Sequence, residues 1–62
     1  MPLSEYDKMR VLDTLDALDY LSQQRVLASE SSFERWLNRV LPHIYNKVRQ
    51  ILGGIWRWLT GR

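Results

Sequence analysis

SSFERWLNRVLPHIYNKVRQILGGIWRWL, residues 31–59, is the stretch that decides the fold class of this 62-residue chain. Its apolar residues recur at alternating intervals of four and three, which is the spacing of a coiled-coil seam. The seam residues are Leu37, Leu41, Ile44, Val48, Ile51, Ile55 and Trp58, and the seam is widened by Phe33, Trp36, Val40, Leu52 and Leu59. This pattern predicts a helix with one continuous apolar face.

Pro42, Gly53 and Gly54 are the helix-breaking residues of this stretch. A proline inside a helix removes a hydrogen bond and bends the axis, and each glycine costs about 1 kcal/mol relative to alanine. Because the seam keeps its phase across both sites, we expect one long helix over about 32–59, kinked at Pro42 and weakened at 53–54. The alternative is a helix capped at Gly53, followed by a short hook, residues 55–59, folded back on the body.

The N-terminal half predicts a second helix, over about 5–26. Ser4, with Glu5 and Asp7 after it, is a helix start, since the hydroxyl accepts from an early backbone N–H and the acids suit the positive end of the dipole. One face of this helix is expected to be buried, and its residues are Val11, Leu12, Leu15, Leu18 and Leu21. A turn is expected at about 27–31, because residues 28–32 read ASESS and Ser31 with Glu34 forms a capping box.

The opposite side of the first helix carries a second, weaker apolar face. Its residues are Tyr6, Met9, Ala17 and Tyr20, which cluster with Asp13 and Asp16. Such a face is either a partner surface or an ordinary solvated side with exposed tyrosines.

Together the two helices predict an all-α fold, a single domain over residues 1–62. We expect an antiparallel helical hairpin whose second helix is longer and kinked. A chain of this size buries only about 60% of its unfolded surface, and it has no cysteine for a disulfide. The apolar arc of the second helix is about 200° wide, more than one antiparallel neighbour covers. We therefore expect two copies to pair through helix 2 into a four-helix bundle dimer.

The charges of the chain are strongly asymmetric. All seven acids lie in residues 1–34 beside three bases, whereas residues 35–62 hold six bases and no acid. Opposite charges favour packing of the two halves against each other, or an acidic target for the basic half. The basic face of helix 2 consists of Arg35, Arg39, Arg49 and Arg57.

The candidate chemical motifs are weak. Asp13, Asp16 and Asp19 are spaced three apart, but short aspartates held along a straight helix cannot wrap a cation, so a solvated acidic flank is expected. His43 is the single histidine and is expected on the polar side of helix 2 beside Arg39. The sequence has no nucleophile motif, phosphate-binding glycine loop or metal-ligand spacing, and it predicts a protein that is not an enzyme and uses no cofactor or metal.

Three tryptophans are heavy usage for a chain of this length. Tryptophan is enriched in binding hot spots and at membrane interfaces. The predicted partner or oligomer interface therefore consists of Trp36, Leu37, Leu41, Ile44, Val48, Ile51, Ile55, Trp56, Trp58 and Leu59. The structural alternative is that the tryptophans belong to the core of a compact hairpin.

The function that this pattern favours is a non-enzymatic interaction, adaptor or regulatory protein that binds itself and a protein partner through helix 2. The rival is a peripheral protein whose basic, aromatic segment 35–62 lies on an anionic bilayer. A third interpretation is a nucleic-acid-binding bundle that uses Arg39 and Arg49. A cytoplasmic location is expected because the first residues resemble no signal peptide, and residues 51–59 are too short to cross a bilayer.

Overall fold

The computed structural model describes residues 3–62, and it is all-helical over that range, with no strand. The helices are α1 (Glu5–Asp16), α2 (Tyr20–Leu27), α3 (Glu30–Val40), α4 (Pro42–Val48) and α5 (Leu52–Gly61), with a 3-10 turn η1 (Arg49–Ile51) before α5. The prediction of an all-α fold is therefore confirmed. The predicted hairpin of two long helices is wrong, because each predicted helix is divided.

The first predicted helix ends at Asp16, and a new helix starts at Tyr20. The sequence holds no proline or glycine here, and the break is made by Asp19. Its backbone is extended, with φ −68° and ψ 169°, and its side chain accepts a hydrogen bond from Ser22 N at 2.8 Å. An aspartate that caps a following helix competes with continuation of the preceding one.

The predicted long helix is also divided, close to the sites of the helix-breaking residues. Leu41 leaves the helical region, with φ −137° and ψ 64°, and Pro42 becomes the first residue of α4. A residue before proline disfavours the helical conformation, whereas proline suits a first helical turn. The second break comes at Val48 and η1, ahead of the glycines, and Gly53 and Gly54 lie inside the first turn of α5.

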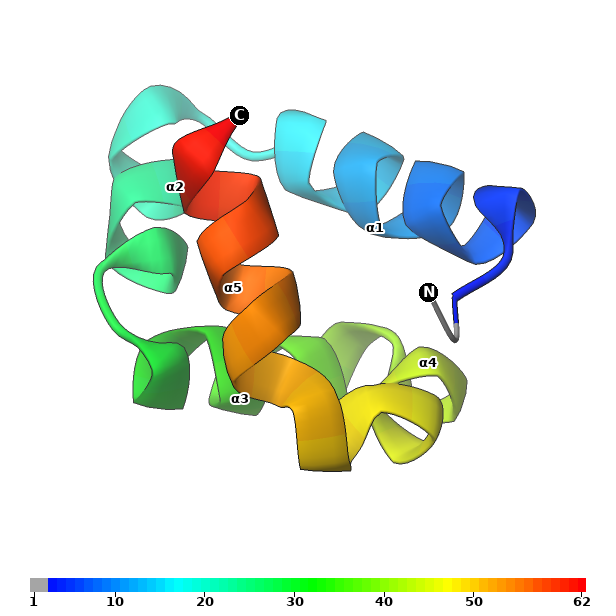
Figure 1. Ribbon diagram of the computed structural model, residues 1–62. Coiled ribbons are helices and arrows are strands. Elements are labelled where there is room, and N and C mark those ends of the chain that lie inside the picture. The colour runs from blue at the N-terminus through cyan, green and yellow to red at the C-terminus, as the bar shows by residue number, and fades with distance from the viewer. Residues whose placement is uncertain (1–2) are drawn as a thin grey trace.

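These breaks fold the chain into a compact body measuring 28 × 23 × 20 Å. A continuous helix over 32–59 would be about 42 Å long. Instead α5 turns back across α3 and reaches α2, while α1 lies along the opposite edge (Figure 1). The alternative of a hook folded back on the body describes the position of residues 55–59 better than the rod, although α5 is a full helix.

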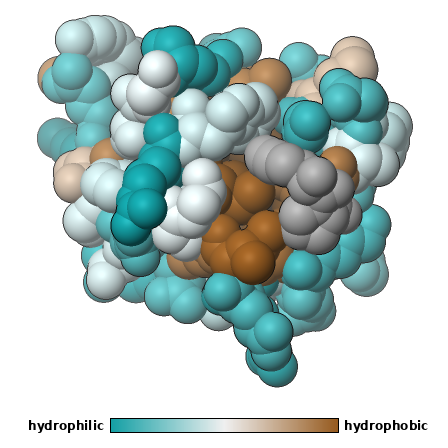
Figure 2. Space-filling model, in the orientation of Figure 1, coloured by the Kyte–Doolittle hydropathy of each residue, from teal (hydrophilic) through white to brown (hydrophobic). Residues whose placement is uncertain are grey.

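The core forms where α1, α3, α4 and α5 meet. Phe33 and Trp36 stack with their ring centroids 5.9 Å apart. The buried apolar residues are Leu3, Val11, Leu15, Phe33, Trp36, Leu37, Leu41, Ile44, Val48, Leu52, Ile55 and Leu59. Figure 2 shows one face on which hydrophobic residues come to the surface in a central area that neutral and hydrophilic residues partly border.

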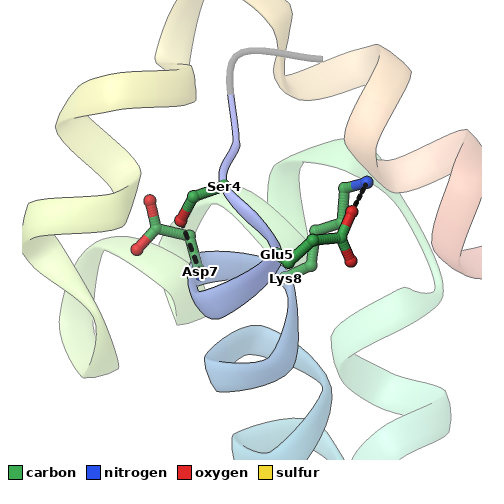
Figure 3. Close-up of polar contacts among 4 residues, drawn as sticks. All are labelled: Ser4, Glu5, Asp7 and Lys8. Atoms are coloured by element: carbon green, nitrogen blue, oxygen red, sulfur yellow. Dashed lines mark hydrogen bonds and ion pairs between the residues drawn. The ribbon is translucent and has the colours of Figure 1, made fainter.

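Two details of the predicted helix starts differ in outcome. Ser4 caps α1 as predicted, accepting from Asp7 N at 3.1 Å (Figure 3). The predicted cap Ser31 is wrong: α3 begins at Glu30, and Ser29 is the cap, accepting from Ser32 N at 3.1 Å.

Leu21 of the predicted buried stripe is 65% exposed, because the break at Asp19 changes the helical phase.

Candidate functional site

The structure places most of the predicted partner interface inside the molecule. Seven of its ten residues are buried, and they are Trp36, Leu37, Leu41, Ile44, Val48, Ile55 and Leu59. Trp56 and Trp58 are half-buried, and Ile51 is exposed. The buried seam residues pack into one core because the chain folds back at the helix breaks, so in this structure they do not form a surface that a partner could contact.

Trp56 shows what the heavy tryptophan usage does. Its indole N–H donates a hydrogen bond of 3.0 Å to the main-chain carbonyl oxygen of Leu27, at the end of α2. Trp36 stacks on Phe33 in the core. These two tryptophans therefore hold the fold together, and Trp58 is half-buried and packs against the core.

The four predicted basic-face residues, Arg35, Arg39, Arg49 and Arg57, are all exposed. None of them forms an ion pair within residues 3–62, where the recorded pairs are Lys8–Glu5 and Lys47–Asp7. The expected pairing between the acidic and basic halves thus occurs once, between α1 and α4. The arginines are distributed over α3, η1 and α5, so they do not belong to a single helix face.

The most exposed large apolar side chains lie in the N-terminal half instead. Tyr6 and Met9 of α1 are 65% and 59% exposed, and Tyr20 and Leu21 at the start of α2 are 67% and 65% exposed. On α1, Tyr6 and Met9 share one side of the helix with Arg10, Asp13 and Asp16 at helical spacing. We call this side the α1 outer face, and its residues are Tyr6, Met9, Arg10, Asp13 and Asp16. Tyr6 and Met9 of the second apolar face predicted for the first helix therefore reach the surface, whereas Tyr20 lies on α2, beyond the break.

A groove of about 280 Å³ borders the α1 outer face, between α1 and the junction of α3 with α4. It is lined by Tyr6, Asp7, Arg10, Val40, Leu41, Pro42, His43 and Ile44. The break before Pro42 creates it, because α4 turns away from the axis of α3 at this point. Sequence reasoning missed the groove, although Pro42 marked the position of the break.

The charges around the groove are not balanced. Asp7, its acidic residue, is buried and accepts a hydrogen bond from Lys47 Nζ at 2.9 Å. This hydrogen bond is the main reason that the pKa of Asp7 lies below its ordinary value, and its burial opposes the shift. Glu5 pairs with Lys8 at 3.1 Å (Figure 3). Arg10 contacts the Tyr6 hydroxyl at 3.4 Å but no carboxylate of residues 3–62. The N-terminal end of the outer face is therefore net positive.

The other titratable groups have structural surroundings. Tyr45 donates a hydrogen bond to Glu34 Oε2 at 3.0 Å, and this bond to a carboxylate raises the pKa of Tyr45. Hydrogen bonding from Ser22 lowers the pKa of the capping residue Asp19. Across residues 3–62, histidine and carboxylate side chains form no group of three or more that could hold a metal ion. Within the same range, no helix is long and apolar enough to cross a bilayer.

Comparisons with known proteins gave no match to this chain. The chain matches no protein-family model, and neither curated proteins nor solved structures gave a match.

Proposed function

We propose that this chain is a non-enzymatic interaction module that binds polypeptides, a second copy of itself included, through the α1 outer face and the groove beside it. One observation carries the proposal: the most exposed large apolar side chains of the described chain lie on α1 and the start of α2. Tyr6 is the one of them that lines the groove, and exposed apolar residues beside a groove are typical of protein interaction sites. The binding surface thus differs from the helix 2 surface that the sequence favours, because the seam is used for the core.

The size of the groove supports a side chain as its occupant. Small-molecule pockets usually measure roughly 300–1,000 Å³, and the groove lies just below that range at about 280 Å³. Val40, Pro42 and Tyr6 give it apolar walls, and α1 and α4 are fixed to each other beside it by the Asp7–Lys47 pair. One or two bulky apolar side chains of a polypeptide would fill such a space.

The rival function is attachment of segment 35–62 to an anionic bilayer. The exposed arginines of this segment support it. However, an interfacial helix must place its apolar face in lipid. Here the apolar faces of α3, α4 and α5 face the core, so attachment would require the fold to open. The nucleic-acid interpretation is supported only by the same arginines, which are spread over three elements. Salt-dependent binding to duplex or single-stranded DNA tests it.

A random peptide library displayed on phage tests the proposal directly. Selection is made on the immobilised full chain at a low density that disfavours self-association. We expect the selected peptides to bind wild type and to lose at least tenfold in affinity towards Tyr6→Ser, while Thr60→Ala on α5 leaves binding unchanged. Peptides that ignore Tyr6→Ser, or wild-type protein that binds only anionic vesicles with a blue shift of tryptophan emission, would contradict it.

A further inference from the structure

We propose that the α1 outer face is covered by a second copy of this chain, in a two-fold dimer whose α1 helices run antiparallel. The inference rests on the proposed function and names the occupant of that site. The face is complementary to itself, because it has a positive end and a negative end, with the apolar residues Tyr6 and Met9 beside the positive one.

The positive end is the N-terminal half of α1. Its two acids are already neutralised, since Glu5 pairs with Lys8 at 3.1 Å and Asp7 pairs with Lys47 at 2.9 Å. Arg10 is exposed and has no carboxylate within ion-pair distance in the described chain. His43 lines the groove beside Arg10 and adds a hydrogen-bond donor.

The negative end is the C-terminal half of α1 with the turn after it. Asp13, Asp16 and Asp19 are exposed, and none is within ion-pair distance of a base of residues 3–62. The helix dipoles of α3 and α4 do not reverse this difference in charge between the two ends of the α1 outer face. The C-terminus of α3 meets the N-terminus of α4 at Leu41, so their opposite partial charges offset each other beside the groove.

An antiparallel pairing of two α1 helices about Asp13 matches the two ends. Position 10 of each copy then lies opposite position 16 of the other, so that two Arg10–Asp16 pairs form. Met9 lies opposite Ala17, which joins apolar to apolar. A pairing moved by one helical turn in either direction separates these partners, because residues on one helix face recur every three to four positions.

The same pairing brings the exposed corner of α2 to the groove. α2 begins beyond the C-terminal end of α1 (Figure 1), and its first residues Tyr20 and Leu21 are each about two-thirds exposed. The antiparallel direction brings the C-terminal end of α1, with this corner after it, towards the N-terminal end of α1 and its groove in the other copy. A Tyr20 or Leu21 side chain is of the size that a groove of about 280 Å³ accepts.

Asp13 gives the dimer a distinctive weakness. It lies at the two-fold axis, where it faces Asp13 of the other copy, and like charges opposite each other oppose association. The pairing therefore predicts that Asp13→Asn strengthens the dimer. Any dimer formed through α5 or through the basic residues 35–62 would not respond to this change.

Sedimentation equilibrium of the full chain, from micromolar to millimolar concentration, tests the inference. We expect a reversible dimer that Arg10→Asp and Asp16→Arg each weaken at least tenfold and Asp13→Asn tightens several-fold. Arg57→Asp on α5 is the matched charge control and is expected to have no effect. Circular dichroism checks that each variant keeps its helices.

Mixing the two weakened variants is the decisive experiment for the Arg10–Asp16 pairing. Arg10→Asp in one copy and Asp16→Arg in the other restore both charge pairs in the heterodimer, so equimolar mixing should recover wild-type association. A monomer at all concentrations, or a mixture that stays dissociated, would overturn the inference. If the wild type stays monomeric while library peptides still depend on Tyr6, only the second copy is excluded as occupant. If such peptides also fail to depend on Tyr6, the proposed function is lost as well.

Discussion

The indole N–H of Trp56 donates a hydrogen bond of 3.0 Å to the main-chain carbonyl oxygen of Leu27, and this bond joins α5 to the last residue of α2. The carbonyl lies near the C-terminal end of α2, where no further helical turn supplies a donor. The return of α5 across the molecule therefore satisfies a backbone acceptor as well as burying apolar surface.

Replacement of Trp56 by phenylalanine tests this contact. The ring keeps most of its apolar area, but the Leu27 carbonyl loses its donor, so we expect a loss of about 1 kcal/mol in the free energy of unfolding. Urea denaturation followed by circular dichroism measures it. Trp58→Phe is the control, because no hydrogen bond of Trp58 is recorded in residues 3–62. Equal effects of the two changes would show that the hydrogen bond contributes nothing.

The start of α3 gives a second prediction. Ser29 accepts from Ser32 N, so Ser29→Ala should destabilise the protein by about 1 kcal/mol. Ser31 is exposed inside the first turn, and Ser31→Ala should change stability by less than about half as much. Thermal or urea unfolding compares the two variants. A larger effect at Ser31 would indicate that Ser31, and not Ser29, caps α3, as the sequence suggests.

The glycines of α5 offer a stabilising change. Gly54 is helical without a positive φ, and apart from its chain neighbours and the backbone of its own helix, a Cβ there meets no atom within 4 Å. Gly54→Ala should therefore stabilise the fold by about 1 kcal/mol. At Gly53 a Cβ would lie 2.7 Å from Glu30 Oε1, so that side chain must move and the gain should be smaller. Urea midpoints measure both, and a destabilised Gly54→Ala variant would contradict the helical start of α5.

The seam itself predicts a contrast between two isoleucines. Ile55 is 2% exposed in the core, and Ile51 is 39% exposed in η1. Ile55→Ala should cost about 3 kcal/mol, whereas Ile51→Ala should cost well under about 1 kcal/mol. Chemical denaturation distinguishes them. In a continuous helix with one buried seam, the two changes would have similar costs.

The pair of Asp7 with Lys47 makes stability depend on pH. The pKa of Asp7 is lower in the folded chain than its ordinary value of 3.8. The carboxylate therefore stabilises the fold above that value, and this stabilisation is lost as the pH falls through 3.8 towards the lowered pKa. Melting temperatures between pH 6 and the acid limit should fall less steeply for Asp7→Asn than for wild type. The pKa of Asp19 is also lowered, so its carboxylate stabilises the fold over the same range of pH. The melting temperature of the Asp7→Asn and Asp19→Asn double variant should therefore depend on pH even less than that of Asp7→Asn.

The sequence determined the helical class, the residues that need burial and the position of one helix start. The 4-3 spacing identified Leu37, Ile44, Val48 and Ile55 as residues with an apolar environment, and all four are buried. Ser4 acts locally, through a cap, so its effect could be predicted from neighbouring residues, whereas Pro42 was expected to kink a continuous helix and instead starts α4.

What covers the seam depends on how the helices pack against one another. An apolar spacing is the same whether a second chain or the folded remainder of one chain buries it, so it could not distinguish a rod from a compact body. The fold breaks the helix at Leu41 and Val48, and burial of the seam between α3, α4 and α5 offsets the lost helical hydrogen bonds. The α1 outer face follows from that fold, because Tyr6 and Met9 belong to the apolar surface that the compact body leaves uncovered.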